Sequence, residues 1–142
     1  MAVIGRAEAA LAVAAALALA ACNSFPTTCD RANGDNPPIV YKDGATEDGV
    51  YRSAPITGPL LYFPGGIRYQ IEHDLGVVPA WWIAYLSFSS DGVDAGTLAP
   101  ASGNEVELEA EDAQSITLTN GECAQFWLMV VAGDGSTAAP TP

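Results

Sequence analysis

A two-residue alternation of apolar and polar side chains, interrupted by glycine and proline, is the sequence feature that most constrains this fold. It is clearest at residues 67–73, where Ile67, Tyr69 and Ile71 share one face of an extended chain and polar residues share the other. It recurs at residues 105–110. An apolar side chain at every second position is the pattern of a strand with one buried face. We therefore expect an all-β protein with no helix after residue 22.

Strands are predicted wherever such runs are separated by turn residues. Pro64, Gly65 and Gly66 form one turn, and Asn120 with Gly121 forms another. A single small antiparallel β-sandwich of about seven strands follows from this pattern, with a small β-barrel as the alternative. The expected strands cover residues 49–53, 59–63, 67–73, 80–88, 105–110, 115–119 and 122–132.

Length and charge exclude several classes of function. A chain of 142 residues has room for one domain. Its 17 acidic residues and 5 basic ones give a formal net charge of -12. A surface of this charge repels phosphate backbones and anionic lipid headgroups, so no nucleic-acid partner is expected. The basic residues all lie at or before Arg68, which leaves the second half of the chain without a lysine or arginine.

The N-terminus has the composition of a targeting segment. Residues 9–21 form an apolar run too short to span a bilayer, and the motif LAAC at residues 19–22 closes this run. This motif resembles the lipobox of bacterial lipoproteins. The resemblance implies a diacylglyceryl group on the Cys22 thiol, cleavage before Cys22 and acylation of the new amino terminus. Two or more acyl chains give a stable anchor in the lipid bilayer. Asn23 stands where an aspartate often retains lipoproteins at the inner membrane, so the resemblance favours the outer membrane.

The rest of the chain is expected to fall into three parts. Residues 22–47 form a lipid-anchored tether and an irregular segment, residues 48–132 the β-sandwich, and residues 133–142 a disordered tail. Within the sandwich, HDLGVVP at residues 73–79 resembles a turn in β-sandwich domains of tail fibres and surface-attached proteins.

Cys29 and Cys123 remain as an even pair if Cys22 carries lipid. In the oxidising cell envelope, a disulfide between them is expected. It would close a loop of about 95 residues, which contributes on the order of 4–5 kcal/mol in the chain-entropy model.

Two predicted strands, residues 80–88 and 122–132, are apolar on both faces and need covering on both sides. Trp81 and Tyr85 share one face of the first strand, whereas Trp82 is on the other; Trp127 is on the second strand. One set of side chains fills the core. We expect the other set either to lie under residues 37–41, in a purely structural envelope component, or to form an aromatic surface that binds a carbohydrate or a partner protein.

Acidic side chains provide a second candidate site. Glu105, Glu107, Glu109, Glu111 and Asp112 are expected to form a ladder along a solvent-exposed face, either keeping the protein soluble or attracting cations. Calcium is the candidate ligand of two acidic loops, because hard cations prefer oxygen ligands. The carboxylates concerned are Asp30 and Asp35 in one loop and Asp91 and Asp94 in the other, and neither loop has the spacing of a calcium-binding motif.

No catalytic motif is present, and we expect no enzyme activity; a small hydrolase is the remote alternative. The sequence lacks a G-x-S-x-G nucleophile elbow, an H-E-x-x-H pair and a phosphate-binding loop. His73, the single histidine, precedes Asp74, but its place on the face of Ile71 predicts a buried residue or a turn cap.

Overall fold

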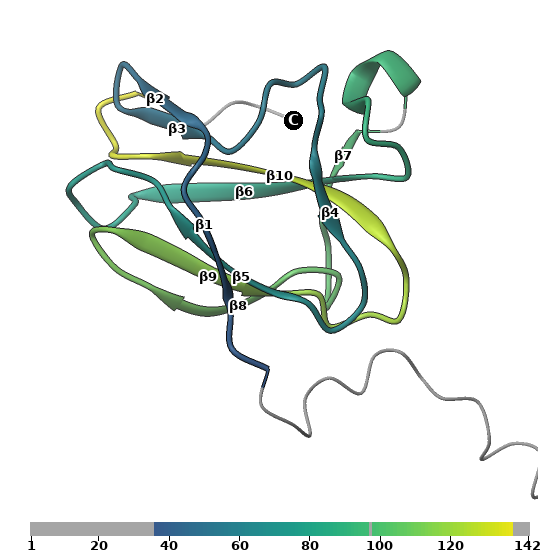
Figure 1. The fold of residues 1–142 in the computed structure, drawn as a ribbon. Helices are drawn as coiled ribbons and strands as arrows, with labels where there is room; N and C mark the ends of the chain where they lie inside the picture. Colours follow the sequence, from purple (N-terminus) through teal and green to yellow (C-terminus); the bar gives the residue numbers. More distant parts are fainter. Residues whose placement is uncertain (1–35, 97, 138–142) are drawn as a thin grey trace, which may run out of the picture.

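Two stacked β-sheets form the protein, as the sequence predicts for a β-sandwich (Figure 1). The computed structural model describes residues 36–96 and 98–137. The targeting segment, Cys22, Cys29, Asp30 and Asp35 lie outside these residues, so the expectations for them stay predictions. Within the described part, no helix is long and apolar enough to cross a membrane. The strands form two separate sheets and not one closed barrel.

The smaller sheet has four strands in the order β1-β5-β9-β8 and is the lower layer in Figure 1. Only β1 and β5 pair in parallel; the other neighbours are antiparallel. The strands are β1 (Ile39–Tyr41), β5 (Arg68–Glu72), β9 (Ser115–Thr119) and β8 (Glu107–Glu111).

The larger sheet is built around the long antiparallel pair β6 and β10. Strands β3 and β4 both pair with β10, one with each half of it, while β2 extends the sheet beyond β3 and β7 extends it beyond β6. The strands are β2 (Ala45–Glu47), β3 (Val50–Arg52), β4 (Leu61–Phe63), β6 (Trp81–Ser87), β7 (Ala99–Pro100) and β10 (Phe126–Gly133).

The core lies between the two sheets and follows the predicted alternation. Ile71 of β5 and Ile116 and Leu118 of β9 point inward and are fully buried. They meet the inner face of β10, where Leu128 and Val130 are also fully buried. Burial of this apolar surface is the main term that stabilises such a fold.

Each of the seven expected strands is present, but several boundaries were wrong. Strands β1 and β2 lie within residues 22–47, which were expected to be irregular, so the sheets begin at Ile39. Gly133, assigned to the tail, is the last residue of β10. The chain also contains a short 3-10 helix, η2 (Gly92–Ala95), where no helix was expected. Strands β1 and β2 and the helix η2 have only three or four residues each, so their sequences show little periodicity.

Candidate functional site

Successive side chains of β6 and β10 point to opposite sides of the larger sheet, as the sequence predicts for two strands. Trp82, Ala84 and Leu86 face the smaller sheet and pack in the main core. Trp81, Tyr85 and Trp127 belong to a second cluster on the opposite side of the larger sheet. We call that side the outer face. Trp82 therefore does not share a surface with the other three candidate residues, as its place on the other face of the predicted strand indicates.

The outer face is only partly covered. Ala54, Leu60, Met129 and Val131 are buried there, whereas Trp81, Tyr85 and Trp127 stay half-exposed. The cover comes from the segment between β3 and β4, which carries Ala54 and Leu60, and from Leu98. The expectation that residues 37–41 cover this face was wrong, because β1 instead forms an edge of the smaller sheet. A strand of three residues is too short for its sequence to predict its partner strand. In the structure, β1 pairs with β5 of the smaller sheet.

Trp81 lies directly over the backbone of Gly133. A Cβ atom at Gly133 would come within 2.3 Å of the indole ring, so only glycine fits beneath it. The Trp81 Nε1 group donates a hydrogen bond to the carbonyl of Thr137 at 3.2 Å. The indole's one polar group is therefore occupied by the chain segment that follows β10.

Trp127 forms an open aromatic pair with Tyr62 of β4. Their ring centroids are 5.2 Å apart with the planes inclined at 52°. The two residues are direct partners in the β4–β10 ladder, so both rings rise from the same side of the sheet. Tyr62 is 42% exposed. Tyr62 was not among the predicted site residues, although its position between the inward-facing Leu61 and Phe63 was a signal available in the sequence.

His73 is fully buried and caps a turn, which confirms the expectation for this residue. Its Nδ1 accepts a hydrogen bond from the Leu75 amide at 3.2 Å, which places the ring proton on Nε2, 3.3 Å from the Asp112 carbonyl oxygen. Both ring nitrogens thus contact the backbone of turns. The imidazole lies in a T-shaped arrangement with the ring of Tyr51, and burial raises the pKa of that tyrosine.

The expected ladder of carboxylates is interrupted in the structure. A β-bulge falls between Leu108 and Ala110, which leaves Glu109 without a partner residue on β9. Glu109 instead accepts hydrogen bonds from Arg68 of β5, at 2.8 Å from Nε, and from the Thr119 hydroxyl. The bond with Arg68 is the main reason that the pKa of Glu109 lies below its ordinary value. This carboxylate is used to join three neighbouring strands.

Two other members of the ladder bond to the backbone. Asp112 Oδ1 accepts from the amides of Gln114 and Ser115, at 2.8 and 2.7 Å, and these bonds lower the pKa of Asp112. Glu105 Oε2 accepts from the Ser102 amide at 2.9 Å. Of the five acidic residues in the ladder, only Glu107 and Glu111 are exposed and form no side-chain hydrogen bond within the described residues.

The described residues offer no cluster of three or more histidine, cysteine or acidic side chains for a metal ion. Asp91 and Asp94 flank the start of η2, and the Asp91 carboxylate accepts a hydrogen bond from the Ser90 hydroxyl at 3.0 Å. These two carboxylates alone supply too few oxygens for calcium, which takes six to eight. The first predicted calcium loop, with Asp30 and Asp35, lies outside the described residues.

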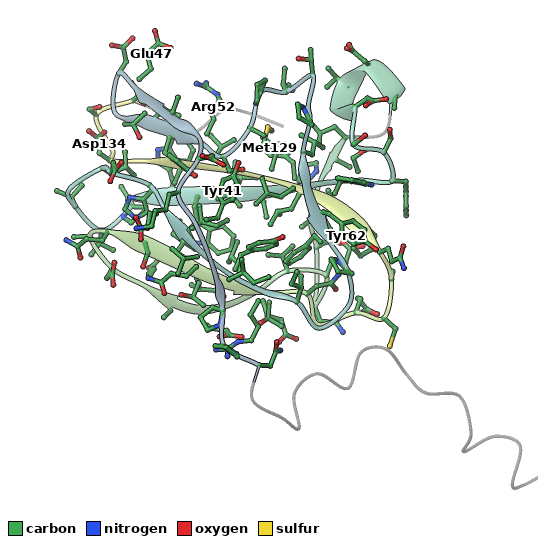
Figure 2. The ribbon with its side chains drawn as sticks, viewed as in Figure 1. Tyr41, Glu47, Arg52, Tyr62, Met129 and Asp134 are labelled. Atoms are coloured by element: carbon green, nitrogen blue, oxygen red, sulfur yellow. The ribbon has the colours of Figure 1, made fainter. Side chains whose placement is uncertain are left out.

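A groove of about 490 Å³ is a further candidate site, which was not predicted from the sequence. It lies between the chain around β2 and the segment that follows β3. Tyr41, Arg52 and Glu47 line it, together with small and apolar residues (Figure 2). These residues come from three separate stretches of chain, so no sequence motif marks the groove.

Cys123 is exposed and disulfide-bonded. It is the only cysteine among residues 36–96 and 98–137. The pairing with Cys29 stays a prediction, because Cys29 is outside these residues.

No protein-family model, curated protein or solved structure matches the chain.

Proposed function

We propose that this chain is a bacterial cell-envelope lipoprotein whose β-sandwich is a non-catalytic carbohydrate-binding module. Acylated Cys22 would attach it to the outer membrane, as the lipobox-like motif implies. The ligand would bind on the outer face of the larger sheet. The open Tyr62–Trp127 pair is the observation that carries this proposal.

Aromatic rings suit the apolar face of a sugar ring, and their polar atoms remain free for water or hydroxyl groups. Tyr85 adds a half-exposed ring on the same face as Trp127. Large apolar side chains that are accessible side by side mark binding surfaces, whereas isolated ones are common on any protein. Trp81 has a structural role in this proposal, since its N–H group is bonded to Thr137.

The single histidine of the chain makes structural contacts. His73 is buried, with both ring nitrogens directed at backbone atoms. Every buried side-chain nitrogen and oxygen in the described part has a hydrogen-bond partner.

The direct test is calorimetric titration of the full-length protein with N-acetylglucosamine oligomers and cello-oligosaccharides. We expect at least one series to bind, and Trp127→Ala to weaken that binding about tenfold through loss of the stacking surface. Phe88→Ala is the matched control, because Phe88 directly follows β6, does not belong to the outer-face cluster and is the most exposed aromatic side chain among the described residues, at 77%. It should change the affinity less than about twofold.

Acrylamide quenching of tryptophan fluorescence separates this function from a purely structural one. Acrylamide is neutral, so the negative charge of the protein does not repel it as it would repel iodide. We expect Trp127→Phe to remove the most accessible fraction of the emission. Absence of any quenchable tryptophan, together with no binding of either sugar series, would favour a structural envelope component with a covered outer face.

A further inference from the structure

The groove beside β2 and β3 contains charges of both signs that no partner neutralises. Its walls include Tyr41, Asp43, Glu47, Arg52, Pro55 and Pro59. Figure 2 shows Arg52 and Glu47 extending on the outer side of the molecule, away from the smaller sheet. None of Trp81, Tyr62, Tyr85 and Trp127 lines the groove, so the groove adjoins the outer face through Ala54 but does not include its aromatic rings.

Arg52 is the unusual charge. Among the described residues, Lys42 pairs with Glu72 at 3.0 Å and Arg68 pairs with Glu109, whereas Arg52 forms no ion pair. The Arg52 guanidinium is exposed and is therefore accessible to an anionic group of a ligand. A guanidinium group binds carboxylates through two parallel hydrogen bonds.

Asp43 and Glu47 supply the opposite charge. Both line the groove and neither forms an ion pair within the described part of the chain. Ala45 and Glu47 pair with Arg52 and Val50 in the β2–β3 ladder, so Glu47 and Arg52 are on the same face of the hairpin. A ligand with one anionic and one cationic end would match both signs. A phosphate dianion would match only Arg52 and would be repelled by the two carboxylates.

Hydrogen bonds hold the walls of the groove in place before any ligand binds. The Tyr41 hydroxyl donates to the Ser53 carbonyl at 2.7 Å, and the Tyr51 hydroxyl donates to the Asp43 carbonyl at 2.8 Å. Thr46 is fixed in the same way, by a bond from its hydroxyl to the His73 carbonyl at 2.7 Å. A preformed site of this kind loses less conformational entropy on binding.

We propose that this groove binds a short peptide with free termini. Arg52 would hold the terminal carboxylate, Asp43 and Glu47 the terminal ammonium group, and Ala54, Pro55 and Pro59 the apolar part. A volume of about 490 Å³ is within the range of small-ligand pockets and leaves room for roughly two to four residues. The proposal rests neither on the lipid anchor nor on the aromatic surface.

Calorimetric titration of the full-length protein with three peptides tests the charge match. The peptides are trialanine, N-acetyl-trialanine, which lacks the ammonium group, and trialanine amide, which lacks the carboxylate. We expect trialanine to bind and each blocked peptide to bind about tenfold more weakly, as loss of a charge-assisted hydrogen bond predicts. Failure of trialanine to bind, or equal binding of a blocked peptide, would overturn the proposal.

Two variants with the same change in net charge locate the site. Arg52→Gln should weaken trialanine binding about tenfold, whereas Lys42→Gln, outside the groove, should leave it within about twofold. Both residues are exposed, so both variants should unfold at nearly the temperature of the unaltered protein. Equal affinities of the two variants for trialanine would also overturn the proposal, because the groove would then not be the binding site.

Discussion

Asp112 illustrates how one carboxylate in this acidic chain contributes to folding. Its Oδ1 accepts two backbone hydrogen bonds and holds the turn between β8 and β9, while its carbonyl oxygen faces the buried His73 ring. The bond from the Gln114 amide is the main cause of the lowered pKa of Asp112, followed by the bond from Ser115. A lowered pKa means that the folded state favours the ionised form over the protonated one.

The stability contributed by Asp112 should therefore depend on pH. It is fully present above the ordinary aspartate pKa and is lost as the pH falls through the lowered value of the folded state. We expect Asp112→Ala to lower the melting temperature at pH 7, and the difference from the unaltered protein to shrink steadily in acid. Thermal unfolding followed by circular dichroism from pH 7 to pH 2 measures it.

Glu111→Ala is the control for this pH series, since the neighbouring Glu111 carries the same charge and forms no hydrogen bond through its side chain within the described residues. It should change the melting temperature little at any pH. A pH-independent effect of Asp112→Ala would show that loss of the side chain, and not of its ionised form, destabilises the turn.

At the scale of elements, glycines let two loops at one end of the sandwich approach each other. Gly92 of η2 has a φ of +57°, and a Cβ atom there would lie 2.2 Å from the Ile56 carbonyl oxygen. The approach allows the Val93 amide to donate to that same oxygen at 3.1 Å. The loop before β4 is thus fixed against η2, and this loop carries part of the cover of the outer face.

Gly92→Ala should destabilise the protein more than an alanine at an open glycine. Gly103 is the matched control, because its φ of +62° is similar but no atom lies within 4 Å of its Cβ position. Left-handed backbone costs about 1–2 kcal/mol for alanine at either site, and the clash adds to this at Gly92 alone. Urea unfolding should give a smaller free energy of unfolding for Gly92→Ala than for Gly103→Ala; equal values would mean that the loops separate without cost.

Most strands were predictable because alternating apolar and polar residues indicate a strand with one buried face. The parity of residues 80–88 also predicted that Trp81 and Tyr85 lie on the face opposite Trp82, but it could not relate this face to Trp127 on the other strand. Strands β1, β2 and β7 have two or three residues each and are too short to show a period. The sequence also contained no signal for the groove, since Tyr41, Arg52 and Pro59 meet only after β1 and β3 have joined different sheets.

At the scale of the whole molecule, the proposed lipid anchor and the proposed disulfide predict that two cysteine variants affect different properties, membrane attachment in one case and stability in the other. Cys123→Ser should lower the free energy of unfolding by about 2–5 kcal/mol and leave the protein in the membrane fraction. Cys22→Ser should leave the stability of the sandwich unchanged and release the protein from the membrane, because the acyl chains are lost. Denaturant unfolding and membrane fractionation measure the two effects. If Cys123→Ser alone abolished membrane attachment, the assignment of roles would be contradicted.

Intact mass spectrometry of the full-length protein, extracted with detergent from a bacterial host, tests the central claim most directly. We predict a polypeptide that begins at Cys22, with the added mass of a diacylglyceryl group and an amino-terminal acyl chain, and with Cys29 and Cys123 oxidised. A mass equal to that of the unmodified chain from Met1 with three free thiols would contradict both the lipid anchor and the disulfide.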